Sequence, residues 1–378
     1  MKVLSIFGTR PEAIKMAPLV VNLNRNSQIN SIVCVTGQHR EMLDQVLDLF
    51  DINPDYDLNV MKKNQSLSEV TSRIITNLSP ILDEVKPDLI LVHGDTTTTF
   101  SAALSGFYHQ VSVGHVEAGL RTGNIFSPWP EEANRKLVSC VTEMHFAPTK
   151  QAMLNLKQEN IDESKIIVTG NTVIDALMMI KDKIESNSKL ENSLTENFPF
   201  IEEGKRIVLV TGHRRENFGQ GFENICESLK SLAIKNKDVN FVYPVHLNPR
   251  VREPVNLLLS NIDNIHLIEP QGYLEFVYLM INSHIILTDS GGIQEEAPAL
   301  GKPVVVMRDT TERPEAVSAG TVILVGTDKE KIIDAIDTLL NDQSKYRKMS
   351  MSHNPYGDGT ASQKIIQHII YKMGEMND

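Results

Sequence analysis

Carboxylates and histidines alternate at the ends of two apolar segments in the first third of this chain. His93 and Asp95 follow one apolar run, and His115 and Glu117 follow the next. Residues two apart in an extended segment share one face of a sheet, so each strand end offers an imidazole and a carboxylate to the same side. These side chains suit general acid–base catalysis. Asp95 and Glu117 are therefore candidate acids or bases.

Other roles are open for these four residues. Asp95 precedes the threonines 96–99 and could cap the next helix. Two histidines and two carboxylates could bind zinc or iron, or the histidines could be buried and satisfied by hydrogen bonds. A capping role explains one acid but not two acids on neighbouring strand ends, and we expect no metal site.

A third candidate, Glu131, stands at the predicted start of a helix. Pro130 suits the first helical position, and the helix dipole favours a carboxylate in the first turn. Arg135 follows four residues later and could pair with Glu131. An ordinary acid at a helix start has the same features, so the case for Glu131 depends on the two earlier carboxylates.

Two glycine-containing turns suit phosphate binding. Ser290, Gly291 and Gly292 lie between an apolar run and a helical pattern, and a Gly-Thr-Arg-Pro turn at 8–11 follows another apolar run. Glycine lets the backbone approach a ligand, and a helix N-terminus offers unpaired N–H groups and a positive dipole end. Glu296 lies one turn further, within reach of a ribose hydroxyl pair. Two such turns indicate two α/β domains of the nucleotide-binding type that face one ligand.

Histidines follow apolar runs in both halves of the chain. His213 follows the predicted strand 206–210, where an imidazole can carry charge to a diphosphate or move a proton near neutral pH. The two arginines after it could equally be surface residues. His39 is placed similarly in the first half and could be merely structural. The Asp-x-Asp pattern at 55–57, typical of metal-dependent sugar-nucleotide transferases, lies in a polar loop, and we interpret it as chance.

Short β-branched runs alternate with helical patterns, which is typical of parallel sheets with crossover helices. The predicted strands are Val3–Phe7, Ser31–Thr36, Leu89–His93, Val111–His115, Met144–Phe146, Ile166–Val168, Arg206–Val210, Phe241–Pro244, His266–Ile268, Ile285–Leu287, Val304–Met307 and Val322–Val325. We predict an α/β fold with two Rossmann-like domains, 1–180 and 205–360, joined by the polar linker region 181–204. The C-terminal helix in 361–378 could pack on either domain, including by crossing back to the first.

Composition and charge exclude several classes of function. The chain has 378 residues, enough for two domains, and its net charge of −11 argues against nucleic acid as the main partner. The three cysteines lack metal-type spacing, so we expect reduced thiols in the cytosol. The amino terminus is a predicted strand rather than a signal peptide. No run approaches the ~20 apolar residues of a membrane span, and we expect a cytoplasmic protein that binds no membrane.

Taken together, the motifs resemble those of a known family. They are Gly8-Thr9-Arg10-Pro11-Glu12, His93-Gly94-Asp95, Glu117-Ala118-Gly119-Leu120-Arg121, Pro130-Glu131-Glu132 with Asn134-Arg135, Gly212-His213-Arg214-Arg215-Glu216-Asn217 and Asp289-Ser290-Gly291-Gly292-Ile293-Gln294-Glu295-Glu296. In this order they are similar to the non-hydrolysing UDP-N-acetylglucosamine 2-epimerases of bacteria, from residue 1 to about residue 360. The resemblance implies the GT-B, glycogen-phosphorylase-like architecture, a homodimer, and no nicotinamide or metal cofactor.

The resemblance also implies roles for individual residues. The catalytic group is Asp95, Glu117, Glu131 and His213. The nucleotide-sugar and active-site contacts are Arg10, Lys15, Arg135, Gln271, Phe276, Ser290, Gly291, Gly292, Glu296 and Arg313. Phe276 could pack against uracil, or it could be a core aromatic of an amphipathic helix.

Some family members are also activated by UDP-N-acetylglucosamine at a second site beside the active site. Gln38, His39, Arg214 and His246 resemble part of that site. Glu41 and Asn64 stand where the regulated members carry Gln and Arg. This departure weakens the case for such regulation here.

The chemistry of an epimerase fits these residues. Inversion at C2 without a redox cofactor requires cleavage of a C2–H bond that is barely acidic, and departure of UDP from C1 makes it feasible. Elimination to 2-acetamidoglucal and re-addition then give N-acetylmannosamine units for a cell-surface polysaccharide. The route needs a base, an acid on the other face, and positive groups at the leaving diphosphate. The carboxylates supply the first two, and Arg10, His213, Arg313 and the helix start at Ser290 supply the third.

Three other functions are open. A glycosyltransferase of the same architecture would need an acceptor, and a hydrolysing epimerase would release UDP and free N-acetylmannosamine. A nucleotide-sugar sensor would bind the substrate without exchanging its C2 hydrogen for solvent deuterium. Each of these three functions, like the epimerase, has a nucleotide sugar as its ligand.

Overall fold

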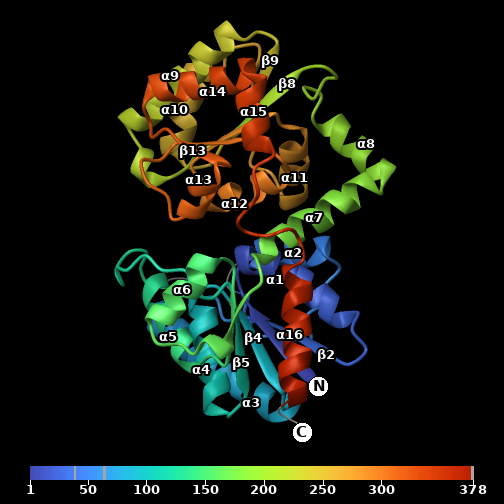
Figure 1. The fold of residues 1–378 in the computed structure, drawn as a ribbon. Helices are drawn as coiled ribbons and strands as arrows, with labels where there is room; N and C mark the ends of the chain where they lie inside the picture. Colours follow the sequence, from blue (N-terminus) through green and yellow to red (C-terminus); the bar gives the residue numbers. More distant parts are fainter. Residues whose placement is uncertain (38–39, 63–64, 376–378) are drawn as a thin grey trace. The chain divides into compact units, whose positions relative to one another are not determined.

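The computed structural model describes residues 1–37, 40–62 and 65–375. The chain forms two compact units, each with its own sheet (Figure 1). The first unit contains Met1–Ala176 and Tyr356–Asp378, and the second contains Leu177–Pro355. Every strand pairing in both sheets is parallel, so the predicted α/β class is confirmed.

The linker region predicted at 181–204 is partly helical. It contains the end of α7 (Thr172–Glu185) and all of α8 (Ser188–Asn197), whose first turn is capped by the side chain of Asn187. The limits 1–180 and 205–360 for the two domains stay a prediction.

The sheet of the first unit has the order β3-β2-β1-β4-β5-β6-β7 in the described part of the chain. Its strands are β1 (Lys2–Phe7), β2 (Asn30–Val35), β3 (Tyr56–Asp57), β4 (Leu89–His93), β5 (Ser112–Val116), β6 (Met144–Ala147) and β7 (Ile166–Val168). Its helices are α1 (Arg10–Asn24), α2 (Arg40–Leu49), α3 (Leu67–Val85), α4 (Thr97–Tyr108), α5 (Glu131–Val141), α6 (Lys150–Gln158) and α16 (Ala361–Glu375), with a 3-10 turn at Glu163–Lys165.

The edge strand β3 contains the Asp-x-Asp pattern that the sequence places in a polar loop. The loop prediction is wrong at Tyr56–Asp57, which pairs in parallel with β2. Asp55 accepts a hydrogen bond from the backbone of Val33 at 2.8 Å, so its carboxylate supports this edge. Two residues are too short a strand for periodicity to show.

The sheet of the second unit has the order β10-β9-β8-β11-β12-β13. Its strands are β8 (Arg206–Thr211), β9 (Val239–Pro244), β10 (Ile265–Ile268), β11 (Ile285–Thr288), β12 (Val304–Val306) and β13 (Val322–Leu324). Its remaining helices are α9 (Gln220–Lys235), α10 (Pro249–Leu259), α11 (Tyr273–Asn282), α12 (Gly291–Ala299), α13 (Pro314–Ala319), α14 (Lys329–Asn341) and α15 (Gln343–Ser350), with a 3-10 turn at Arg215–Asn217.

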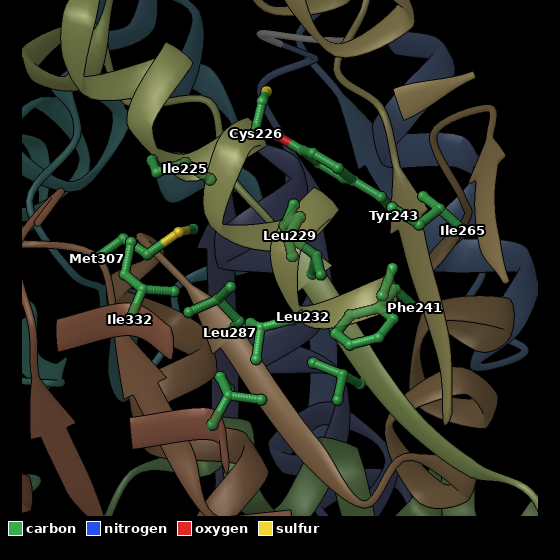
Figure 2. Close-up of a cluster of buried hydrophobic side chains, with 14 of the residues drawn as sticks. Ile225, Cys226, Leu229, Leu232, Phe241, Tyr243, Ile265, Leu287, Met307 and Ile332 are labelled. Carbon is green, nitrogen blue, oxygen red and sulfur yellow. The ribbon is translucent and has the colours of Figure 1, made fainter. Parts of the chain in front are cut away.

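The core of the second unit lies between its sheet and the helices that cover it. Leu229 and Leu232 of α9 pack with Phe241 of β9, Leu287 of β11 and Ile332 of α14, all at most 1% exposed (Figure 2). Burial of each such side chain contributes about 2 kcal/mol to stability. The rigid sheet is what holds the polar residues beyond its strand ends in place.

The C-terminal helix α16 belongs to the first unit. Asp175, at the first turn of α7, accepts hydrogen bonds from the backbone of Ala361 at 3.1 Å and Ser362 at 2.8 Å. This carboxylate therefore caps the N-terminus of α16 from another segment of the chain. The helix packs beside α1, where Asn22 donates to the Ser362 hydroxyl at 2.9 Å.

None of the described helices combines the length and the apolar character that crossing a bilayer requires.

Candidate active site

In each sheet the strand order reverses at one point, and candidate residues follow the strands that flank it. In the first unit these strands are β1 and β4, followed by Arg10 and Asp95. In the second unit they are β8 and β11, followed by His213 and Ser290. Ligands of open α/β sheets bind outside the carboxyl ends of the strands at such switch points. The topology therefore gathers the predicted residues at the chemically expected end of each sheet.

Glu117 follows β5 and is held by side chains from two other elements. Its Oε2 atom pairs with the Lys15 ammonium of α1 and accepts a hydrogen bond from Asn171 at 2.8 Å. The Nε2 atom of His93 is 3.9 Å away. Glu117 has a φ of 65°, a left-handed conformation that is uncommon for a residue with a side chain. Backbone strain of this kind is concentrated at functional sites, where the surroundings hold it.

Asp95 is positioned by helix α5. The guanidinium of Arg135 binds its Oδ2 through Nε and Nη2, both at 2.8 Å, and Asn134 donates to its backbone carbonyl at 2.9 Å. Arg135 also binds the fully buried Glu132 at 3.0 Å. The predicted pair of Arg135 with Glu131 is therefore wrong, because the guanidinium binds Asp95 and the buried Glu132 instead.

Glu131 and Arg10 complete the predicted residues of the first unit. Glu131 is half-buried in the first turn of α5, and Arg10 is half-buried in the first turn of α1. Within the described parts of the chain, neither side chain has an ion-pair partner. Both therefore keep their charge available for a ligand.

Glu12 joins the two turns of the first switch point. Its buried carboxylate accepts hydrogen bonds from two backbone N–H groups of the turn after β1, at 2.9 and 2.8 Å. It also accepts from the hydroxyls of Thr96 at 2.5 Å and Thr99 at 3.1 Å. Burial raises the pKa of Glu12, and these hydrogen bonds oppose the shift. The result is a fixed spacing between the turn of Arg10 and the turn of Asp95.

The strand-end histidines are buried. Burial lowers the pKa of His93 to about 4 and that of His115 to about 4, so both are neutral at pH 7. The Nε2 atom of His115 lies 2.7 Å from the carbonyl oxygen of Gly94 and donates to it. This contact matches the interpretation of His115 as a buried, hydrogen-bonded residue. No group of three His, Cys, Asp or Glu side chains suited to a metal occurs among the described residues.

In the second unit, two arginines converge on the start of helix α12. A Cβ atom built on Gly291 would lie 3.7 Å from the guanidinium carbon of Arg313 and 3.8 Å from Nη2 of Arg214. Ser290 makes no side-chain cap, so it leaves the first N–H groups of the helix to a ligand. Glu295, which is 1% exposed, pairs with Arg313 and orients it. Helix dipole, uncapped N–H groups and two guanidiniums together make this position a candidate anion-binding site.

His213 lies beside this anion-binding site. Its ring stacks on that of His246, with centroids 5.3 Å apart, and its Nδ1 atom is 3.8 Å from the buried carboxylate of Asp289. Burial lowers the pKa of His213, while the charge of Asp289 opposes the shift and the neighbouring His246 and Arg214 add to it. The imidazole thus has one negative and two potentially positive neighbours.

The remaining predicted contacts belong to α11, α12 and the loop before α11. Glu296 is buried next to Gly292 and accepts a hydrogen bond from the Tyr273 hydroxyl at 2.8 Å. Gln271 donates to the carbonyl of Glu269 at 2.6 Å. Phe276 is half-buried in the first turn of α11, with part of its ring accessible.

Comparisons with known proteins show the family of this chain. The family model described as UDP-N-acetylglucosamine 2-epimerase matches residues 21–370. This chain belongs to that family. A relative named UDP-N-acetylglucosamine 2-epimerase in Yersinia pestis is 61% identical over 367 residues, which is 97% of this chain and 98% of the relative. One of the same name in Escherichia coli K12 is 60% identical over the same shares. The family resemblance of the motifs is confirmed.

Solved structures of this epimerase family share the fold. The enzyme from Neisseria meningitidis, bound to UDP-GlcNAc, is 57% identical with a TM-score of 0.90, covering 98% of this chain and 100% of its own. The enzyme from Methanocaldococcus jannaschii, in complex with UDP-GlcNAc and UDP, is 35% identical with a TM-score of 0.79 over 98% and 100%. The GT-B architecture expected from the resemblance is confirmed.

The residues proposed for a second ligand site are only partly described. Gln38, His39 and Asn64 lie outside the described residues. Arg214 and His246 both lie against the anion-binding site of the second unit, through Gly291 and His213 respectively. The assignment of Arg214 and His246 to a second ligand site stays a prediction.

Three supporting residues received no role from the sequence. Glu12, Asn171 and Asp289 are each at most 3% exposed and each binds a candidate residue or its backbone. A signal was present, since Asp289 directly precedes the phosphate-type turn and Asn171 follows a predicted strand. Their side-chain partners are distant in sequence, so only the fold shows what they hold.

Proposed function

We propose that this enzyme interconverts UDP-N-acetylglucosamine and UDP-N-acetylmannosamine by inverting C2, without net release of UDP. The observation that carries the proposal is the division of chemistry between the units. The first carries Asp95 and Glu117 after β4 and β5 and Glu131 in the first turn of α5, and the second carries a candidate anion-binding site at the start of α12. Proton transfer next to a bound diphosphate is what an elimination and re-addition require.

The proposed reaction begins with removal of the C2 proton by one of the carboxylates. The electron pair of the C2–H bond becomes the second bond between C1 and C2, and the C1–O bond breaks with its electrons leaving on UDP. The intermediate is 2-acetamidoglucal. An oxygen of the UDP diphosphate then adds back to C1 while C2 takes a proton on the opposite face. Asp95, Glu117 and Glu131 supply the base and the acid, and each such group contributes about 10²–10⁴-fold in rate.

Positive groups stabilise the leaving diphosphate in this proposal. Arg214 and Arg313 converge at Gly291 beside the free N–H groups of α12. His213 adds a charge when it is protonated, and Arg10 in the first unit has no competing carboxylate among the described residues. On the basis of the family resemblance, we assign sugar and nucleotide contacts to Lys15, Arg135, Gln271, Phe276 and Glu296.

A deuterium experiment tests the proposal. The purified enzyme is incubated in D₂O with UDP-N-acetylglucosamine as the sole substrate, and C2 of the sugar is followed by NMR. We expect both epimers to form and to carry deuterium at C2. Conversion with complete retention of the substrate hydrogen would rule out the elimination route.

The same experiment separates the other functions. A glycosyltransferase would leave the substrate unchanged without an acceptor. A hydrolysing epimerase would release UDP and free N-acetylmannosamine in proportion to turnover. A sensor would bind the nucleotide sugar with no deuterium at C2.

We further propose that the enzyme is a cytoplasmic homodimer supplying N-acetylmannosamine units for a cell-surface polysaccharide. Light scattering coupled to size exclusion tests the dimer, and cell fractionation tests the location. Loss of the polysaccharide on deletion of the gene, with recovery on complementation, tests the pathway. Titration of the initial rate with UDP-N-acetylglucosamine tests activation: a sigmoidal curve supports the second site, and a hyperbolic curve contradicts it.

A further inference from the structure

Asn171 has a side-chain amide whose two ends are both used. It lies between β7 and α7 and is 3% exposed. Its Oδ1 atom accepts a hydrogen bond from the backbone of Val173 at 3.1 Å, and its Nδ2 atom donates to Glu117 at 2.8 Å. The backbone N–H of Val173 can only donate, and the carboxylate of Glu117 can only accept. These partners therefore fix which end of the amide faces Glu117.

The backbone of Asn171 is fixed as well. Its N–H donates to the carbonyl of Tyr356 at 2.7 Å. The preceding Gly170 has a φ of 90°, and a Cβ atom there would lie 3.2 Å from the Tyr356 carbonyl oxygen and 3.3 Å from Gly357 Cα. Only glycine tolerates this conformation and this approach without strain.

This contact lies at the point where the chain returns to the first unit. The chain leaves the first unit after Ala176, shortly beyond Asn171, and re-enters it at Tyr356. Continuous hydrogen bonds therefore run from the re-entering segment through Asn171 to Glu117.

A neutral, rigid donor suits the role of holding a base. Lys15 also binds Glu117, but its ammonium sits on a flexible four-carbon stem and fixes little of the carboxylate orientation. The short, doubly anchored amide of Asn171 fixes the position of the Oε2 atom of Glu117 without adding a second cation. Proton transfer requires such orientation, since a displacement of 1 Å costs about 10²-fold in rate.

We infer that Asn171 is a positioning residue: it orients the Glu117 carboxylate for proton transfer and ties that orientation to the re-entering segment at Tyr356. The inference rests on the proposed function of Glu117 in the C2 epimerisation. It predicts an effect on kcat rather than on KM, because Asn171 acts through Glu117 and not on the substrate.

The sharpest test is Asn171→Asp. A carboxylate at position 171 keeps the acceptor for the Val173 N–H, so the start of α7 and the fold are retained. It replaces the donor to Glu117 with a like charge, while Lys15 and His93 still face that site. A like charge raises the pKa of one member of a carboxylate pair. We expect kcat to fall about 10–100-fold with KM nearly unchanged, and the acid limb of the kcat profile to move to higher pH.

Two matched variants separate orientation from charge and from capping. Asn171→Ser keeps a short acceptor for the helix start but has no donor that reaches Glu117, so kcat should fall without the shift of the acid limb. Asn187→Asp makes the same chemical change at the cap of α8, in the second unit. Its kcat, KM and pH profile should be those of the wild type.

The outcomes are distinct. Wild-type kcat in folded Asn171→Asp and Asn171→Ser, with melting temperatures near that of the wild type, would overturn this inference and leave the proposed function in place. A wild-type pH profile in Asn171→Asp despite a lower kcat would also overturn it. Full activity of Glu117→Gln, or absence of deuterium at C2 in the wild type, would instead remove the proposed function on which it rests.

Discussion

The carboxylate of Asp289 binds the turn of His213 with one oxygen and faces its ring with the other. Oδ2 accepts hydrogen bonds from the backbone N–H groups of His213 at 2.9 Å and Arg214 at 2.8 Å. Oδ1 lies 3.8 Å from Nδ1 of His213 and has no hydrogen-bond partner among the described residues. A small rotation of the imidazole would complete this bond, which fixes the tautomer and favours the protonated ring.

Asp289→Asn is therefore expected to lower the pKa of His213. The negative charge of Asp289 raises that pKa, and its removal leaves burial, His246 and Arg214, all of which lower it. NMR titration of the His213 ring measures the effect directly. We also expect kcat/KM to fall near neutral pH, because the protonated fraction of the imidazole shrinks about 10-fold for each unit by which its pKa falls. An unchanged titration curve in a folded variant would show that Asp289 only holds the turn.

Removal of any one of the three candidate carboxylates should greatly slow the exchange of the C2 hydrogen with solvent. Asp95→Asn, Glu117→Gln and Glu131→Gln are each expected to reduce deuterium incorporation about 10²–10⁴-fold. Glu69→Gln is the matched control for a helix-start acid, because Glu69 caps α3 together with Ser66 and has no predicted role in the site. It should alter stability more than chemistry. Retention of wild-type exchange in one of the three would exclude that residue as the essential acid or base.

Gly291→Ala should weaken nucleotide binding without weakening the fold. The added methyl group would meet its nearest atoms at 3.7 Å, an ordinary contact distance, and alanine favours the helix over glycine. The methyl would nevertheless occupy the space toward which Arg214 and Arg313 converge. We expect the affinity for UDP to fall about 10-fold by calorimetry, since one blocked phosphate contact is worth about 1–2 kcal/mol.

Gly374→Ala provides the control for that substitution. Gly374 lies in α16, and a Cβ atom there would meet nothing within 4 Å. UDP affinity should stay at the wild-type value, while both alanine variants should melt at or slightly above the wild-type temperature. Equal losses of affinity in both variants would contradict a phosphate site at Gly291.

The first unit should lose stability in mild acid because it buries neutral histidines. Burial lowers the pKa of His145 to about 3, against 6.5 for an exposed imidazole, so the unfolded chain binds the proton first as the pH falls. Stability from this residue is present above pH 6.5 and is lost as the pH falls toward 3. His145→Leu should therefore reduce the loss between pH 7 and pH 5 by about 2 kcal/mol, measured by calorimetry of the acid-sensitive transition. An unchanged pH dependence would place the sensitivity at His93 and His115.

The sequence predicts this molecule well where local signals and fold rules act together. Strands such as Leu89–His93 are apolar, β-branched and followed by polar residues, so both the strand and its functional end are visible. The two-residue strand at Tyr56 and the true partner of Arg135 are not visible, because tertiary contacts decide them. A spacing of four residues in a helix allows Arg135 to pair with Glu131. In the structure Arg135 instead binds Asp95, which follows β4, and the buried Glu132.

Supporting residues form the other class that sequence alone does not reveal. Asn171 contacts Glu117 across 54 residues, and Asp289 contacts His213 across 76. No periodicity or spacing rule reaches that far. Such residues become visible only when the sheets bring distant strand ends together.

Helix α16 and helix α1 come from opposite ends of the polypeptide, yet they pack in one unit, with Asp175 fastening the later helix. During translation the amino-terminal sheet must therefore wait for Ala361–Glu375 to leave the ribosome before its covering layer is complete. The second unit is contiguous and meets no such delay. Synthesis on stalled ribosomes should give a protease-resistant second unit before the first one, and loss of the final fifteen or so residues should leave the earlier sheet exposed to aggregation.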